Sequence, residues 1–219
     1  MKKIFLTLSV AASMLLAHGN HEGMHHHKNM PKKAKCVTEV SKKLQKNPSK
    51  EVMKMMHNPM MCAKWIESGD ANRDFLENMI PHHKGAILAS EALLKYTKNN
   101  EMKTIANQII QEQTKEIKDF EAFLKKLPKE ELADYKNFAS KAKEDMKKMM
   151  EAMHKVSLSN NVDKDFLAAM IAHHQGAVDA SKQILAVTKN EQIKAFAQNI
   201  INTQEKEIKN FEAMLKNIK

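Results

Sequence analysis

Residues 75–87 read FLENMIPHHKGAI, and residues 166–178 read FLAAMIAHHQGAV. The likeness extends well beyond these two stretches. Residues 74–125 align with residues 165–216 without a gap, at a constant offset of 91, and 29 of the 52 positions are identical. Chance does not produce such a match, so the chain contains an internal duplication whose unit is a supersecondary element.

Each copy predicts a hairpin of two helices. The chain is rich in Ala, Glu, Lys, Leu, Ile and Met, which favour helices, and it contains only five Gly and five Pro. In each copy, apolar residues recur at steps of three and four on both sides of a polar turn, KNN at 98–100 or KNE at 189–191. The first helix is expected to begin near Asp74 or Asp165, with Asp70, Asn72 or Asp163 as alternative N-caps. We therefore predict an all-α fold in which two hairpins pack as a four-helix bundle.

The segments around the hairpins have distinct compositions. Residues 1–17 carry two lysines, then an apolar run, then a small residue at the end, which is the order of a secretory signal peptide. Because the apolar run is short for a bilayer span, we expect an exported, periplasmic protein without stable membrane insertion. The expected segments are a signal peptide (1–17), a His- and Met-rich disordered tail (18–30), an N-terminal helical segment (31–70), the first hairpin (71–128), a Met-rich connecting helix (129–160) and the second hairpin (161–219).

Finer boundaries follow from helix-breaking residues. In the N-terminal segment we expect two short helices, near 32–46 and 50–57, separated by NPS at 47–49 and ended by Pro59. The tail at 18–30 contains five histidines and two methionines without apolar periodicity, a composition typical of disordered metal-binding tails.

The charge of the chain is basic, with a formal net value of +10. A basic protein can bind nucleic acid or anionic lipid. Here every basic residue except Arg73 is a lysine, and the lysines are spread along the predicted helices. Proteins that read bases depend on arginine, so solvated helix faces explain the charge better, and we expect no nucleic-acid partner.

Cys36 and Cys62 are the only cysteines. In an exported chain an even pair favours a disulfide, which would close a loop in the N-terminal segment. A pair of soft metal ligands is the alternative.

Histidines and methionines form the pattern that bears most directly on function. Beyond the tail only six histidines remain; four form two adjacent pairs, each with a methionine one turn before it. The other two, His57 and His154, each lie in or end a methionine-rich stretch, 53–61 or 146–154, shortly before a repeat begins. The candidate metal ligands are Met79, His82, His83, Met170, His173, His174, His57, Met56, His154, Met150 and Met153.

These residue types point to copper. Thioether sulfur is soft and suits Cu(I), while imidazole accepts Cu(I), Cu(II) and zinc alike. Methionine also fills cores as an adaptable apolar side chain, and for any single methionine that is the default interpretation. The duplication of methionine with two histidines favours copper, with Cu(I) preferred and Cu(II) as a second state.

Small and polar residues near the pairs need an explanation of their own. Gly85 and Gly176 lie inside predicted helices, where Gly costs about 1 kcal/mol relative to Ala, so they suggest the close approach of another helix or a ligand. In the second helix of each copy, a glutamine (113, 204) interrupts the apolar seam and a glutamate (116, 207) follows one turn later. These groups either hold a histidine ring nitrogen or are half-exposed edge residues.

Other chemistries find little support. A ferritin-type di-iron site needs Glu-x-x-His on two helices, and beyond the tail at 18–30 only Glu151–His154 has this spacing. No haem-attachment motif, phosphate loop or nucleophile elbow occurs. A copper-dependent oxidase would need an open coordination position and a substrate pocket, and the sequence identifies neither. We therefore expect no enzyme.

The two stretches quoted above, together with IIQEQTKEIKDFEAFL and IINTQEKEIKNFEAML, resemble the family called domain of unknown function 305, here in two tandem copies. The resemblance implies a ferritin-like helical bundle, and its CopM-like members imply an exported copper-binding protein linked to copper tolerance. It also implies that the methionine and two histidines of each copy are copper ligands. The family often has methionine where Ala89, Ala180, Phe120 and Phe211 stand here, so the usual ligand set is incomplete. The Met-His stretches at 53–61 and 146–154 are candidates to replace it.

The expected function is therefore sequestration or buffering of copper, in support of copper tolerance or trafficking. Copper ions are the expected partners, and a copper exporter or a metallochaperone is a candidate protein partner. A Met-rich helical chaperone or protein-interaction module is the alternative, since flexible methionine surfaces suit promiscuous binding. That alternative accounts for the methionines but not for the paired histidines.

Overall fold

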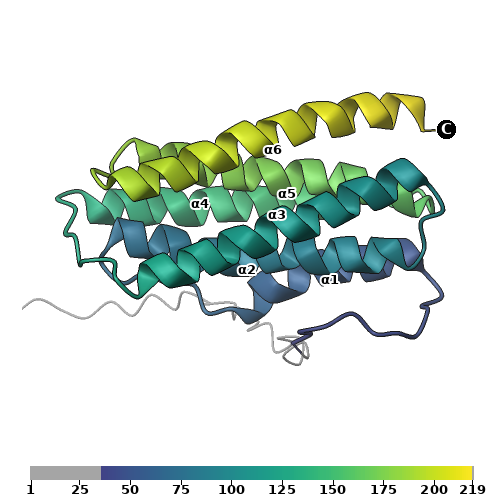
Figure 1. The fold of residues 1–219 in the computed structure, drawn as a ribbon, viewed down its shortest axis with the longest axis horizontal. Helices are drawn as coiled ribbons and strands as arrows, with labels where there is room; N and C mark the ends of the chain where they lie inside the picture. Colours follow the sequence, from purple (N-terminus) through teal and green to yellow (C-terminus); the bar gives the residue numbers. More distant parts are fainter. Residues whose placement is uncertain (1–35, 219) are drawn as a thin grey trace, which may run out of the picture. The chain divides into compact units, whose positions relative to one another are not determined.

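Figure 1 shows the computed structural model, which describes residues 36–218. This part of the chain contains six helices and no strand, so the predicted all-α class is confirmed. The expected signal peptide (1–17) and tail (18–30) lie outside the described residues. None of the described helices has the length and apolar character needed to cross a bilayer. The helices are α1 (Pro48–Cys62), α2 (Ala71–Leu94), α3 (Asn100–Leu124), α4 (Tyr135–His154), α5 (Val162–Leu185) and α6 (Glu191–Asn217).

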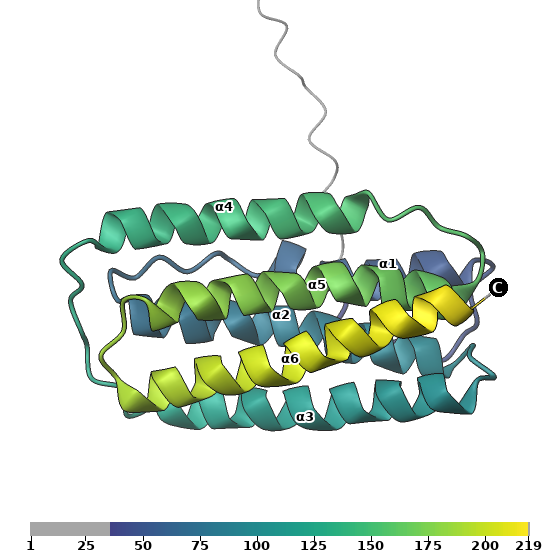
Figure 2. The same cartoon turned by 90° about the horizontal axis from the view of Figure 1, so that it is seen from above.

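The helices are arranged as two hairpins with one additional helix each. Helices α2 and α3 form one hairpin, α5 and α6 form the other, and α2 packs against α5 between them. Helix α1 packs along α2 and also contacts α5, while α4 packs along α5. Figure 2 shows α3 and α6 along one side of α2 and α5, with α4 on the opposite side. The fold is thus a four-helix bundle with α1 and α4 added against the α2–α5 pair.

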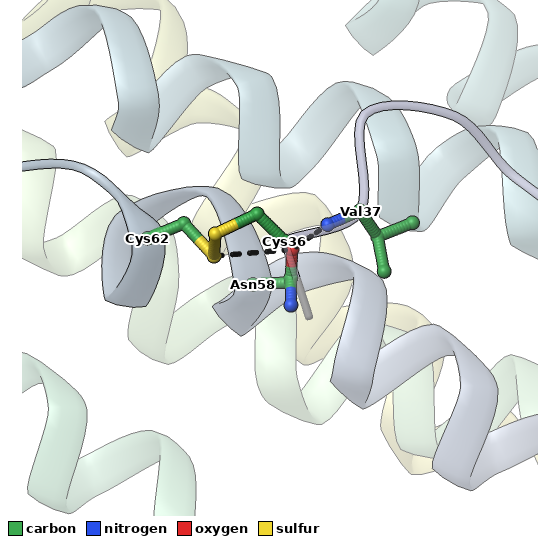
Figure 3. The surroundings of a disulfide bond; sticks show 4 residues. All are labelled: Cys36, Val37, Asn58 and Cys62. Atoms are coloured by element: carbon green, nitrogen blue, oxygen red, sulfur yellow. Dashed lines mark hydrogen bonds between the residues drawn. A yellow bond between two sulfur atoms is a disulfide. The ribbon is translucent and has the colours of Figure 1, made fainter. Parts of the chain in front are cut away.

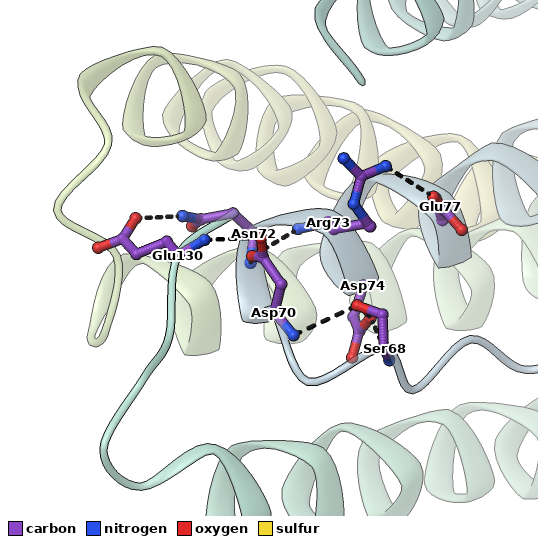
Figure 4. Close-up of polar contacts among 7 residues, drawn as sticks. All are labelled: Ser68, Asp70, Asn72, Arg73, Asp74, Glu77 and Glu130. Carbon is purple, nitrogen blue, oxygen red and sulfur yellow. Dashed lines mark hydrogen bonds and ion pairs between the residues drawn. The ribbon is translucent and has the colours of Figure 1, made fainter. Parts of the chain in front are cut away.

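Both first helices of the hairpins begin with an Asx cap. Asp70 accepts hydrogen bonds from the backbone N–H groups of Asn72 and Arg73 at the start of α2 (Figure 4). Asn161 does the same for α5. The alternative N-cap Asp70 is therefore confirmed, whereas the expected starts near Asp74 and Asp165 are a few residues late, because the capping side chain precedes the first apolar residue of the helix.

A serine fixes the chain just before each cap. In copy one, the backbone N–H and the hydroxyl of Ser68 both donate to Oδ1 of Asp74, at 2.8 and 2.6 Å (Figure 4). Ser159 and Asp165 repeat these bonds at 2.8 and 2.7 Å. The residue after each serine has a positive φ, 93° in copy one, where it is a glycine, and 66° in copy two, where it is Asn160. Glycine and asparagine are the residues that tolerate this conformation best.

The hairpin turns are also duplicated. Asn99 and Asn190 cap α3 and α6, and each receives support from the hydroxyl of Thr97 or Thr188, which accepts the asparagine N–H at 3.1 Å. These turns match the predicted KNN and KNE stretches and bring the second helix of each copy back along the first.

The N-terminal segment departs from expectation. Residues 36–46 form no helix, so the predicted helix at 32–46 is wrong in its described part, and α1 continues through Pro59 to Cys62. Proline removes one hydrogen bond of the helix, but a single missing bond is tolerated when packing holds the helix. Cys36 and Cys62 form a disulfide with their Cα atoms 5.7 Å apart, and Asn58 lies beside it and accepts the N–H of Val37 (Figure 3). The disulfide prediction is confirmed, and the alternative of two cysteine metal ligands is wrong.

The methionines are unevenly distributed in the interior. One core cluster, formed by α1, α4 and the ends of the hairpins nearest them, contains most of the buried methionines, whereas the cluster at the opposite end contains only Met79. The buried methionines of the first cluster are Met55, Met56, Met60, Met102, Met149, Met153, Met170 and Met214. The added helices therefore bring thioether groups to the α2–α5 pair.

Candidate metal centre

The paired histidines meet where α2 crosses α5. The rings of His82 and His173 lie face to face, with centroids 3.7 Å apart and planes inclined by 31°. Nε2 of His82 lies 3.1 Å from the backbone carbonyl oxygen of His173. A carbonyl only accepts, so Nε2 carries the proton and Nδ1 of His82 presents a lone pair. That Nδ1 atom is buried and has no hydrogen-bond partner.

A glutamate fixes the other histidine of each pair. Nε2 of His83 lies 2.8 Å from Oε2 of Glu116, and Nε2 of His174 lies 2.9 Å from Oε2 of Glu207. The second contact is close, although its angle falls short of a hydrogen bond. In both rings Nδ1 is buried without a partner. A carboxylate on one ring nitrogen with the other nitrogen free is the arrangement that orients histidine for a metal ion.

Among the four paired histidines, His173 has the fewest polar contacts at its ring nitrogens. It is fully buried, and neither of its ring nitrogens has a hydrogen-bond partner. Burial lowers the pKa of His173 well below its ordinary value, and the neighbouring histidines, His82 first, lower it further. The pKa of His82 is lowered in the same way, by burial first and then by His83. Both imidazoles are therefore neutral at neutral pH, which is the form that binds a metal.

The two glycines allow the added helices to approach the histidine pairs. A methyl group on Gly85 would lie 2.3 Å from the backbone oxygen of Met56 in α1 and 3.4 Å from Nε2 of His173. A methyl group on Gly176 would lie 2.3 Å from the sulfur of Met149 in α4. The expected close approach of another helix at each glycine is therefore confirmed. In both copies the helix that approaches brings a methionine.

A cavity of about 60 Å³ lies beside the first pair, between α2, α4 and α5. Its lining is mostly apolar, and it includes His82 and three methionines, Met79, Met146 and Met149. Trp65, the only tryptophan of the chain, also lines it. Soft sulfur and an imidazole thus converge on one small pocket.

The equivalent methionine of the second copy has different surroundings. Met170 is fully buried in the methionine-rich cluster, together with Met55, Met56 and Met60 of α1. The two copies therefore present similar donor residues in different surroundings.

His57 and His154 lie together although 97 positions separate them in the sequence. Their ring centroids are 5.1 Å apart and their planes are inclined by 40°. Burial, and then the proximity of His154, lowers the pKa of His57 to about 4. Nε2 of His57 is buried without a partner, whereas His154 is exposed at the end of α4.

The structure thus brings the predicted ligands into two neighbouring groups. The four paired histidines gather at the α2–α5 crossing, and His57 meets His154 at the ends of α1 and α4. Met146 and Met149 line the cavity but were not among the candidates, although their spacing with Met153 places them on one apolar face of α4. Glu116 is hydrogen-bonded to His83 and Glu207 lies close to His174, whereas the side-chain oxygens of Gln113 and Gln204 are buried without a partner.

The donor types limit the ions that fit. Among the described residues, no three His, Cys, Asp or Glu side chains gather around one point that could hold a metal ion. Calcium and magnesium need six or more oxygen ligands, and zinc usually takes at least three His, Cys or carboxylate ligands. A metal ion bound here would need thioether ligands, which favours a soft ion.

The chain matches a known family and several solved structures. The model of the family described as Domain of unknown function (DUF305) matches residues 12–124 and again residues 72–215. No curated protein matches the chain in sequence. A structure described as CopM in the Cu(I)-bound form is 29% identical, covers 67% of this chain and 96% of its own, and has a TM-score of 0.50. CopM in the Ag-bound form, obtained by soaking, is 28% identical over 67% of this chain and 95% of its own, with a TM-score of 0.51.

A more distant structure is similar in fold. A DUF305 fragment from Deinococcus radiodurans is 22% identical, covers 68% of this chain and 97% of its own, and has a TM-score of 0.52. In each comparison about a third of this chain lies outside the common part.

Proposed function

The chain belongs to the DUF305 family, and from this premise we propose that it is an exported protein that binds Cu(I) and holds it without catalytic turnover. In this proposal it buffers copper and supports copper tolerance, and it exchanges the ion with a copper exporter or a metallochaperone. The similarity to CopM in its Cu(I)-bound and Ag-bound forms supports the choice of ion. The disulfide supports export, because disulfides persist in oxidising compartments.

One observation carries the proposal. Nδ1 of His82, Nδ1 of His83 and both ring nitrogens of His173 are buried without a hydrogen-bond partner. An unsatisfied buried polar atom costs about 1–3 kcal/mol, so a protein retains several together only where they serve a purpose. Each neutral imidazole has one lone-pair nitrogen, and binding a metal ion satisfies that nitrogen directly. The nearby thioethers select a soft ion for this role.

The alternative of a methionine-rich chaperone is less well supported. Such a protein needs methionines on its surface to hold apolar segments of clients. Among the described residues, Met61 and Leu44 are the only large apolar side chains that are strongly exposed. Most of the methionines in this part of the chain face the interior, where a client cannot reach them.

Measurement of Cu(I) binding near Trp65 tests the proposal. Because this single tryptophan lines the cavity with Met79 and His82, its fluorescence reports an ion bound there. We expect Cu(I), added without oxygen, to change the emission in a saturable manner. Met79→Leu should weaken this response about tenfold or more, since it removes a soft ligand, while the volume-conserving change costs less than about 1.5 kcal/mol of stability.

Met102→Leu is the matched control. Met102 is fully buried in α3 and does not line the cavity, so its replacement should leave the Cu(I) response unchanged. A second variant replaces all four paired histidines with glutamine, and its fold is checked by circular dichroism. If this variant is folded and binds Cu(I) as tightly as the original protein, the assignment of the paired histidines is wrong.

A further inference from the structure

A second group of metal-binding side chains lies outside the four paired histidines. It is built from the ends of α1 and α4, which the duplication does not include. Each helix carries the same short pattern, a methionine followed four residues later by a histidine. The residues are Met53 and His57 in α1, and Met150 and His154 in α4.

Helical spacing places each methionine beside its histidine. Side chains four residues apart lie on the same face of a helix, one turn from each other. Met53 and Met150 are both half-buried and pack against the same methionine-rich core cluster. The two patterns therefore face a common region between the helix ends.

The distance between the two rings fits a shared ion. The ring centroids of His57 and His154 are 5.1 Å apart. Two imidazoles bound to one tetrahedral ion, at a metal–nitrogen distance of about 2.0 Å, have centroids roughly 5 Å apart. The rings of His82 and His173, at 3.7 Å, are stacked too closely to bind one ion between them.

One ring nitrogen of this histidine pair is already buried away from solvent. Nε2 of His57 is buried and has no hydrogen-bond partner among the described residues. His154 is exposed, so the same place can be reached from solvent. A buried, unsatisfied nitrogen beside an exposed histidine is what a surface site with an inward-facing ligand requires.

We propose that His57 and His154, with Met53 and Met150, form a separate, solvent-accessible site for one soft monovalent ion, Cu(I) or Ag(I). Two imidazoles and two thioethers make a ligand set that suits Cu(I) and lacks the oxygen ligands of hard cations. The identity of the ion rests on the proposed function, whereas the location of the site rests on the geometry of α1 and α4. The site is the outermost of the histidine groups. His57 is close enough to the buried His173 to lower its pKa.

Ag(I) titration followed by nuclear magnetic resonance of the histidine rings tests the site. The full chain is used, and each ring is observed separately, so metal bound by the histidines at 18–30 does not confuse the result. We expect the ring signals of His57 and His154 to shift together and to saturate at the same silver concentration. His154→Gln should weaken the silver response of His57 by about tenfold or more, since one ligand is lost.

Lys155→Gln is the matched control, because it alters the neighbouring exposed residue at the end of α4. It should leave the response of His57 unchanged. If the signals of His57 and His154 do not shift, or if His57 responds identically in the His154→Gln variant, the site is refuted. If the buried histidines respond while this pair does not, the proposed function stands and only this site is lost. A response of this pair alone supports the site and contradicts the role of the paired histidines.

Discussion

The two glycines provide a matched test of how closely α1 packs on α2 beside the paired histidines. Gly85→Ala places a methyl group 2.3 Å from the backbone oxygen of Met56, well inside contact distance. Helix α1 would have to move away, but its C-terminal end is held by the disulfide at Cys62. Its N-terminal end is held by Glu51, which pairs with Lys95 at 2.7 Å. Overpacking of this kind costs about 1–3 kcal/mol.

Gly176→Ala gains the same helix propensity as Gly85→Ala, but its steric clash costs less free energy. Both changes gain about 1 kcal/mol of helix propensity, so this contribution cancels when the two variants are compared. At Gly176 the clash is with the side chain of Met149, which can rotate towards the cavity. We therefore expect the Gly85→Ala variant to be less stable than the Gly176→Ala variant by about 1–2 kcal/mol.

Urea unfolding followed by circular dichroism measures this difference. The two variants and the original protein are compared without metal, at one pH and with the disulfide intact. Equal stability of the two variants, or a Gly85→Ala variant more stable than the original protein, would refute the close packing of α1 on α2.

Two further predictions concern protons and the glutamates. Because burial keeps the pKa of His82 and of His173 well below 6.5, the unfolded chain binds their protons first as the pH falls. The contribution of the two rings to the free energy of unfolding should thus be complete above pH 6.5. Below pH 6.5 it should fall by about 1.4 kcal/mol per pH unit for each ring. Urea midpoints measured from pH 7.5 to 5 test this, and midpoints that do not change with pH would contradict it. Glu116→Gln should weaken Cu(I) binding about 10- to 100-fold, because the carboxylate that orients His83 is lost. The exposed Glu121→Gln is its control, and equal affinities in a Cu(I) competition titration would exclude a role for Glu116.

The sequence was sufficient for the elements that depend on local chemistry. The duplication, the hairpin turns and the all-α class all follow from periodicity and from capping residues close together in the chain. The alternation of apolar residues also shows that the histidine pairs lie on the buried face of each first helix. The start of α5 was missed by a few residues, because Asp165 and Asp163 were the expected start and cap, whereas Asn161 caps the helix.

Features that depend on contacts between distant helices could not be predicted in this way. The absence of a helix at 36–46 reflects the disulfide and the docking of this stretch, not its composition. The cavity depends on where the apolar face of α4 docks against α5, and the spacing within α4 does not show its partner. The meeting of His57 with His154 depends on two helix ends that no local pattern connects.

The stacked rings of His82 and His173 lie at equivalent positions of the two copies, yet their partners differ. His82 donates to a backbone carbonyl, whereas both nitrogens of His173 have no partner. If the bundle were a homodimer of a single repeat, each substitution would occur in both subunits, at both equivalent positions. In this single chain a substitution alters one copy alone. Joining the repeats in one chain therefore allows each histidine pair to change while the other is preserved.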